Sequence, residues 1–266
     1  MVVNAGSIFR AISDFLLQPL LWLEQVLRSA PPWAVLLAIG LIAFAVSHRI
    51  LLAVLLVVAG YLLGALQLWT EAMQTLALMI SAVLLAVIIG MPLGVLSARS
   101  DRFRAVLRPV LDVMQTIPSF VYLIPVAMLF GLGKVPAIIA TVIYATPPLI
   151  RLTDLGIRGV DLRVTEASRS FGATRWQILR GVQFPLALPS IMQGLNQTTM
   201  AALAMVVIAS LIGARGIGET VLLGLQRNDI GTGLVGGIGI VLLAVILDRV
   251  TQAAGRRTQT YRERQD

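Results

Sequence analysis

The sequence lacks several residue types on which catalytic and metal sites depend. It has no cysteine and a single histidine, His48, and charged residues make up only 13% of its 266 residues. Disulfides, thiolate metal sites, thiol nucleophiles and sites with two imidazoles are therefore excluded. The chain has no G-x-x-x-x-G-K-[ST] motif either, so it cannot bind ATP through a P-loop of its own. These absences leave few residues for an intramembrane enzyme.

Hydrophobic residues, by contrast, make up 58% of the chain. A soluble domain carries about 25% charged residues, so this composition excludes a soluble globular domain and a disordered chain. A membrane span needs about 20 mostly apolar residues. Stretches free of Asp, Glu, Lys and Arg give seven candidate spans, namely 29–48, 50–70, 72–98, 113–133, 135–150, about 189–213 within the run 181–214, and 230–247. The sequence predicts an all-α membrane protein with about seven transmembrane helices.

The basic residues gather on one side of this arrangement. Sixteen of the 21 lie at residue 49, in the loops 99–112 and 151–180 and in the tail 248–266. Because loops rich in Arg and Lys stay in the cytoplasm, we expect the amino terminus outside and the carboxyl terminus inside. The net charge of +8 then reflects cytoplasmic loops and anionic lipid rather than nucleic acid. Only residues 47–49 separate the first two spans, so a tight hairpin or a re-entrant pair is an alternative there.

Residues 1–30 have a different pattern from the spans. Their apolar residues recur at helical spacing, and charged or amide residues lie mostly between them. This pattern predicts an amphipathic helix that lies on the membrane surface. A cleaved signal peptide is less favoured, because no basic cluster precedes an apolar run with a small-residue cleavage site.

The longest polar stretch between spans is the loop 151–188. It keeps apolar residues at helical spacing in two groups, with Gly172 between them and Pro185 after the second. Glycine adopts a left-handed turn at little cost, and proline cannot continue a helix. The loop is therefore expected to form two short helices that join at Gly172 and end at Pro185. On these residues alone, a helix pair that binds lipid headgroups is equally compatible.

The loop also carries a spaced motif. It consists of Glu166-Ala167-Ser168, three residues, Gly172, nine residues, and Val182-Gln183-Phe184-Pro185. This resembles the signature loop of ABC-importer permeases, which reads E-A-A, three residues, G, nine residues, I-x-L-P; Ser168, Val182 and Phe184 are small or apolar departures from it. The resemblance implies that the loop docks on a separate ATPase subunit. It assigns coupling roles to Glu166, Ala167, Ser168, Gly172 and Pro185.

The resemblance extends over about residues 70–252. The segments 93–95, 107–125, 128–133, 205–210 and 246–249 look like the permease of glycine betaine, proline betaine and choline importers. This implies a type I ABC permease core at 70–250 with a cytoplasmic coupling loop, in addition to the amphipathic segment 1–30, two further spans in 31–69 and a basic tail at 251–266. It also implies uptake of a quaternary ammonium osmoprotectant across a bacterial plasma membrane.

The same resemblance implies the partners. They are a second permease copy, two ATPase chains that use ATP and Mg, an extracytoplasmic solute-binding protein and membrane lipid. No cofactor is expected on this chain and no nucleic acid partner.

Five polar or aromatic residues are candidates for the translocation pathway: Asp112, Gln115, Tyr122, Asn196 and Gln197. Asp112 and Gln115 lie at the cytoplasmic entrance of the span 113–133, where such groups also cap helices or reach the interface. Amides inside a span must pair with another helix or face water, so Asn196 and Gln197 either join helices or line the pathway. The Tyr122 ring could attract a quaternary ammonium, although packing is the more common role of such a ring.

Two other functions remain as alternatives. An ABC importer for another small solute, such as an amino acid, would carry the same coupling loop. A secondary transporter or channel would need charge inside the spans and often has inverted repeats, whereas the charges here lie in the loops. An ATPase that co-purifies with the chain would separate the importer from this second class.

Overall fold

The computed structural model describes residues 2–263, and within this range the regular structure is entirely helical. The α-helices are α1 (Val2–Ser29), α2 (Pro32–Ser47), α3 (Ile50–Ala65), α4 (Trp69–Arg99), α5 (Asp101–Thr116), α6 (Leu123–Phe130), α7 (Lys134–Arg158), α8 (Leu162–Ser170), α9 (Arg175–Ile178), α10 (Phe184–Ile208), α11 (Ile217–Gln226) and α12 (Ile230–Glu263). Short 3-10 turns η1 (Ser119–Tyr122) and η3 (Ala209–Ile212) and a π-helical turn η2 (Leu179–Gln183) connect some of them.

Long helices form the body of the molecule. Four stretches are long and apolar enough to cross a membrane, namely Trp69–Arg99, Lys134–Arg158, Arg175–Ile212 and Ile230–Gly255. Two sharply bent helix pairs raise the number to six if each pair is one span, and α3 is a shorter apolar helix. The expectation of an all-α membrane fold is therefore confirmed.

Glycines allow the central helices α4, α7 and α10 to pack closely. A Cβ placed on Gly94 of α4 would come 2.6 Å from the Cβ of Thr153 on α7. A Cβ on Gly156 of α7 would come 2.7 Å from the Cβ of Ser190 on α10. The hydrophobic effect does not drive helices together in lipid. Small residues at such contacts let the helices approach closely, so that van der Waals packing stabilises them.

The predicted uninterrupted span 113–133 is wrong. Helix α5 already begins at Asp101 and ends at Thr116, and the segment Ser119–Phe130 continues at an angle of 107° to it. The cause is local: Ile117 precedes Pro118 and is extended, with φ −70° and ψ 127°, because a residue before proline is disfavoured in helical conformation. Most of the predicted loop 99–112 is consequently helical.

The predicted loop 151–188 also differs at both ends. Helix α7 runs on to Arg158, so its span is longer than the apolar run 135–150. At the other end Pro185 does not stop a helix, because α9, η2 and α10 follow one another without a break. Pro185 lies in the first turn of α10, where a missing N–H is tolerated, directly after the π-helical turn.

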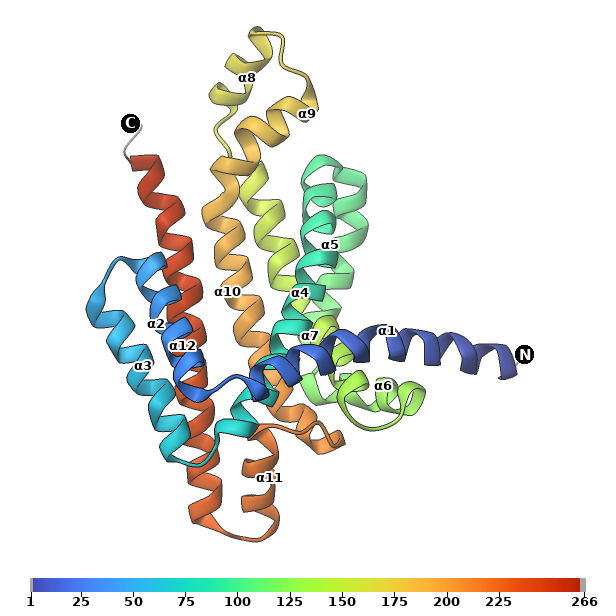
Figure 1. The fold of residues 1–266 in the computed structure, drawn as a ribbon. Coiled ribbons are helices and arrows are strands. Elements are labelled where there is room, and N and C mark those ends of the chain that lie inside the picture. Colours follow the sequence, from blue (N-terminus) through green and yellow to red (C-terminus); the bar gives the residue numbers. More distant parts are fainter. Residues whose placement is uncertain (1, 264–266) are drawn as a thin grey trace.

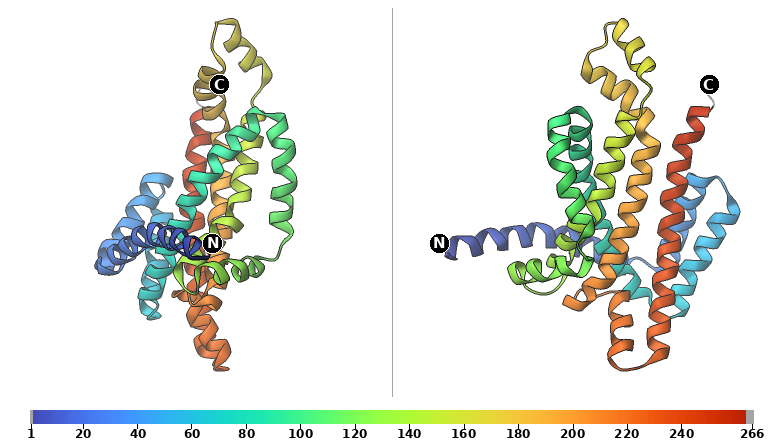
Figure 2. Two further views of the ribbon diagram at one scale, coloured as in Figure 1. Left: turned by 90° about the vertical axis from the view of Figure 1, so that its right-hand side faces the viewer. Right: turned by 180° about the vertical axis from the view of Figure 1, so that it is seen from behind.

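The amino-terminal helix crosses the long helices, and different elements lie at the two ends of the bundle. In Figure 1, α1 runs nearly at right angles to the long helices, and the axis of the following α2 is bent 104° from it. Helices α2 and α3 form a hairpin beside α12. The α8–α9 pair and the carboxyl end of α12 lie at one end of the bundle, and α11 lies at the opposite end, as both views of Figure 2 also show. Of the segment 1–30 predicted to be helical, Val2–Ser29 form a helix, and its place on a membrane surface stays a prediction.

Candidate coupling and translocation site

Helices α8 and α9 project beyond the bundle as a compact pair (Figures 1 and 2). The Asp161 carboxylate caps the start of α8 by accepting a hydrogen bond from the Arg163 N–H at 2.9 Å. Gly172 follows α8 with φ +81°, a left-handed value that favours glycine. Thr174 and Gln177 then form a reciprocal capping box that starts α9. The structure thus contains the predicted pair of short helices with its turn at Gly172.

The outer surface of this pair is exposed and partly apolar. Phe171 at the tip is 92% exposed, and Trp176 is 59% exposed. Glu166 and Ala167 are also exposed, Ser168 is half-buried, and Glu166 has no ion pair among the residues that the structure describes. An exposed aromatic tip beside unpaired charge is typical of a surface that a partner covers.

Charged residues that sequence reasoning missed connect the root of this pair to α5. Asp154 near the end of α7 is 6% exposed and binds Arg158 of its own helix at 3.0 Å and Arg104 of α5 at 2.9 Å. The Arg158 guanidinium also binds Asp101 at 2.6 Å and the Ser97 carbonyl at 2.8 Å. The i, i+4 spacing of Asp154 and Arg158 is visible in the sequence, but nothing in the sequence indicates the partners on α4 and α5.

Three of the five pathway candidates lie on the segment formed by α5 and η1. Asp112 and Gln115 are exposed on α5, and the Arg151 guanidinium of α7 binds the Asp112 carboxylate. The Tyr122 hydroxyl donates a hydrogen bond to the Met114 carbonyl at 2.6 Å, so η1 folds back onto α5. The Tyr122 and Tyr144 rings lie 6.3 Å apart between their centroids, at an interplanar angle of 57°.

The other two candidates, Asn196 and Gln197, lie on α10 and differ in their contacts. The Asn196 amide group donates to the Asp248 carboxylate at 3.3 Å, and its oxygen accepts a hydrogen bond from the Thr251 hydroxyl. The Gln252 amide donates to both Asp248 oxygens at 2.8 Å. The two Asn196 contacts join α10 to α12 and favour the helix-joining role of Asn196, and the Gln252 contacts within α12 hold the Asp248 carboxylate. Gln197, by contrast, is exposed.

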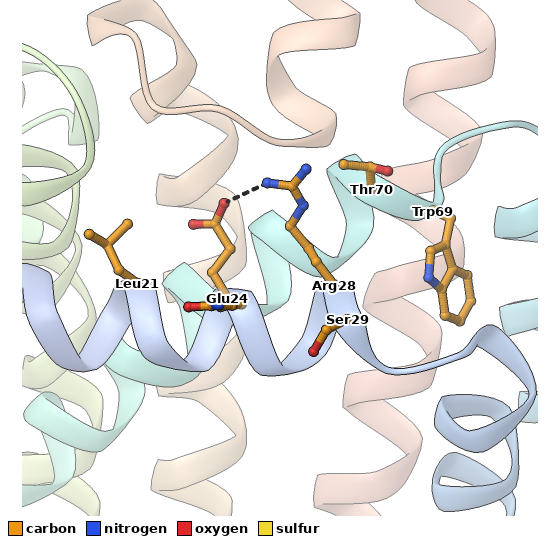
Figure 3. A pocket seen from close by; sticks show the side chains of 7 residues that line it. Leu21, Glu24, Arg28, Ser29, Trp69 and Thr70 are labelled. Atoms are coloured by element: carbon orange, nitrogen blue, oxygen red, sulfur yellow. Dashed lines mark ion pairs between the residues drawn. The ribbon is translucent and has the colours of Figure 1, made fainter.

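A second cluster of charges lies at the junction of α1 and α4, beside an open cavity of about 530 Å³. Figure 3 shows side chains that line this cavity, among them Glu24 and Arg28. Glu24 of α1 is 5% exposed, and its carboxylate accepts a hydrogen bond from the Gln74 amide at 3.2 Å. It also pairs with Lys134 at the start of α7 and with Arg28 at 3.6 Å. The cluster fastens α1 to the bundle. Among the side chains of residues 11–255, no group of three or more His, Cys, Asp or Glu residues could hold a metal ion.

Comparisons with known proteins agree with this geometry. Residues 90–260 match the family described as "Binding-protein-dependent transport system inner membrane component". A glycine betaine/proline betaine transport system permease protein of Escherichia coli is 50% identical over 237 residues, which cover 89% of this chain and 67% of the relative. A glycine betaine/carnitine transport permease protein of Listeria monocytogenes is 46% identical over 240 residues, covering 89% and 85%.

The fold has a counterpart among solved structures. A chain from an inward-facing structure of the MetNI methionine ABC transporter matches with a TM-score of 0.62 and 25% sequence identity. The match covers 73% of this chain and 95% of that chain. The transporter chain and this chain therefore share a permease fold.

Proposed function

The chain belongs to the family of binding-protein-dependent transport system inner membrane components, and on this premise we propose that it is the permease subunit of an importer of quaternary ammonium osmoprotectants. The observation that carries the proposal is the projecting α8–α9 pair with its Glu166–Gly172 spacing. Its exposed Phe171 side chain and its unpaired Glu166 carboxylate are available for apolar and ionic contacts with a partner. A rigid pair of this kind can enter a groove and pass on the motion of that partner.

The proposed partner of the α8–α9 pair is a separate ATPase chain that uses ATP and Mg, with Glu166, Ala167, Ser168 and Gly172 at the contact. Pro185 lies in the helix that follows and has a structural role there. A second permease copy and an extracytoplasmic solute-binding protein complete the proposed complex. In this arrangement the α8–α9 end faces the cytoplasm, as the predicted orientation requires.

Glycine betaine is the first proposed substrate. The relatives quoted above are named for glycine betaine, proline betaine and carnitine, which are small solutes that carry a quaternary ammonium and a carboxylate. The pathway candidates on α5 suit such a net-neutral solute, because the carboxylate among them, that of Asp112, is balanced by Arg151. Gln115 and Tyr122 on the same segment are the proposed pathway contacts, with Gln197 as a further candidate on α10.

Uptake by the assembled complex tests the proposal. The permease, the co-purifying ATPase and the binding protein are reconstituted in vesicles, and uptake of labelled glycine betaine, choline and methionine is compared with ATP and with a non-hydrolysable analogue. We expect ATP-dependent uptake of a quaternary amine and none of methionine. Methionine uptake without betaine or choline uptake would move the substrate class to amino acids. Uptake that does not need ATP, from a chain that brings no ATPase, would contradict the importer altogether.

A further inference from the structure

The buried carboxylate of Asp154 is held by two arginines from different helices. Arg104 reaches it from α5 at 2.9 Å, and Arg158 reaches it from the last turn of α7 at 3.0 Å. The Arg158 guanidinium continues to Asp101 at 2.6 Å and to the Ser97 carbonyl at 2.8 Å. We call Ser97, Asp101, Arg104, Asp154 and Arg158 the root cluster. Its two carboxylates balance its two guanidinium groups, so the buried Asp154 is not left as an unpaired charge, whereas Asp101 at the edge of the cluster is exposed.

The root cluster lies where the coupling loop leaves the bundle. Helix α7 ends at Arg158, and α8 begins only four residues later at Leu162. A displacement of α8 and α9 therefore reaches α7 at the root cluster, and it reaches α10 through the continuous helical stretch Arg175–Ile212. Close packing makes α4, α7 and α10 move together, since a Cβ at Gly94 would already overlap with Thr153.

Helix α5 is attached to this block in a different way. Of its 16 residues, all of which the structure describes, only Leu111 is buried. Its Val106, Val110 and Val113 side chains are 72%, 51% and 56% exposed. Apolar packing within the chain therefore does little to fix the position of α5, and the contacts that remain are mainly ionic.

Three ion pairs join α5 to α7. Arg104 of α5 meets Asp154 of α7, whereas the carboxylates of Asp101 and Asp112 on α5 meet Arg158 and Arg151 of α7. Because the pairs do not all have the same polarity, a slip of one helix along the other would move them out of register, so this arrangement specifies one relative position. The Asp154 pair is the least exposed of the three, with side chains 23% and 9% exposed, against 26% and 87% for Arg158 and Asp101 and 40% and 64% for Arg151 and Asp112. Solvent and salt screen it less, so it carries more of the connection.

We propose that Asp154 is a positioning residue that makes α5 follow the coupling loop. The inference rests on the proposed function, in which an ATPase moves α8 and α9. With the root cluster intact, a movement of α7 displaces α5 as well, so the pathway side chains Asp112 and Gln115 move with each ATPase cycle. Without the Arg104–Asp154 contact, the loop and α7 still move, but α5 and the pathway lag behind.

The first experiment measures transport per ATP hydrolysed. Asp154→Asn and Arg104→Gln each remove the contact, and Arg102→Gln is the matched control, because Arg102 is exposed on the same helix. We expect both variants to lose about tenfold in substrate transported per ATP, within the usual range of coupling between two sites. Arg104→Lys keeps the charge and should recover most of this ratio. An unchanged ratio in Arg104→Gln would overturn the proposal, even if Asp154→Asn failed to fold.

The second experiment follows α5 directly. The chain has no cysteine, so cysteines for spin labels can be introduced in pairs. One variant carries labels at 106 and 241 and reports the distance between α5 and α12. A second variant carries labels at 170 and 241 and reports the distance between the coupling loop and α12. All three positions are exposed. In the unsubstituted complex, trapping with ATP should change both distances. In Asp154→Asn the 170–241 change should remain and the 106–241 change should shrink.

These outcomes separate the inference from the proposed function. An α5 that still moves fully in Asp154→Asn overturns the positioning role and leaves the importer intact. If instead the unsubstituted chain shows no loop movement and brings no ATPase, the proposed function itself fails.

Discussion

Gly94 on α4 lies directly against Thr153 on α7, so that a Cβ at Gly94 would come 2.6 Å from the Thr153 Cβ and 2.9 Å from the Ile150 carbonyl oxygen. Neither neighbour is the flexible end of a side chain, so the helices themselves would have to separate. Helix α7 carries the coupling loop at its end. The distance between α4 and α7 therefore helps to determine the position of that loop.

Replacing Gly94 by Ala should destabilise the permease by about 1–3 kcal/mol, the usual cost of overpacking. Gly237→Ala is the matched control, since Gly237 also lies within a helix and nothing lies within 4 Å of the added Cβ. There, the better helix propensity of alanine should leave stability unchanged or slightly higher. Thermal unfolding of both purified proteins in the same detergent measures the difference, and equal midpoints would contradict the tight contact.

Replacing Gly172 by Val should uncouple the loop by distorting its turn. Gly172 has φ +81° and open space around its Cα, so the cost is conformational rather than steric. It amounts to about 1–2 kcal/mol for an ordinary residue and more for a β-branched one. Uptake and ATPase co-purification should both fall. Gly172→Asn is the control, because asparagine tolerates the left-handed region, and equal loss in both variants would point to contact with the partner instead.

Reversing the charge of Glu166 should weaken assembly without unfolding the permease. Glu166 is exposed and has no ion pair with the side chains described, those of residues 11–255, so Glu166→Lys removes no contact among them. We expect normal membrane insertion and a reduced yield of bound ATPase, restored in part by high salt, which screens the repulsion. Arg227→Glu at the opposite end is the control and should bind ATPase normally. Full ATPase binding by Glu166→Lys would place the contact elsewhere.

Local features of this chain could be predicted from its sequence, and distant pairings could not. The turn at Gly172 was predictable because its glycine, the caps on either side and the spacing all lie within a dozen residues. The break of the span 113–133 was missed because a search for uncharged runs ignores backbone geometry, although Pro118 was a usable signal. Arg104 and Asp154 lie 50 residues apart, and only the packing of α5 on α7 brings them together.

The role of Asn196 illustrates a second limit. Both alternatives, joining helices and lining a pathway, place an amide inside a span. The sequence does not indicate how α10 is rotated about its own axis. This rotation turns Asn196 toward Asp248 and leaves Gln197 exposed. Two adjacent residues of similar chemistry therefore differ in surroundings for a reason that only tertiary packing supplies.

Removing the Glu24 charge should loosen α1 from the bundle. Glu24→Gln leaves Lys134 without its buried counter-charge and costs up to about 3 kcal/mol. Hydrogen exchange should then accelerate in residues 11–29 but not in α12. The double variant Glu24→Gln with Lys134→Met removes both charges and should recover much of the protection, whereas Asp14→Asn on the exposed face of α1 should have no effect. Unchanged exchange in Glu24→Gln would show that apolar contacts alone hold α1.

The direction of the chain in the membrane follows from which end of the bundle faces the cytoplasm. Ser168 lies on the projecting pair, and Arg227 lies between α11 and α12 at the other end. In the predicted topology, sixteen of the 21 basic residues share a side with the loop 151–180, and such loops remain in the cytoplasm. Since the chain has no cysteine, Ser168→Cys and Arg227→Cys each create a single thiol. An impermeant thiol reagent added to intact cells should label position 227 and spare position 168, and permeabilised cells should label both. The reverse pattern would place the α8–α9 pair outside the cell, where no ATP-driven partner could reach it.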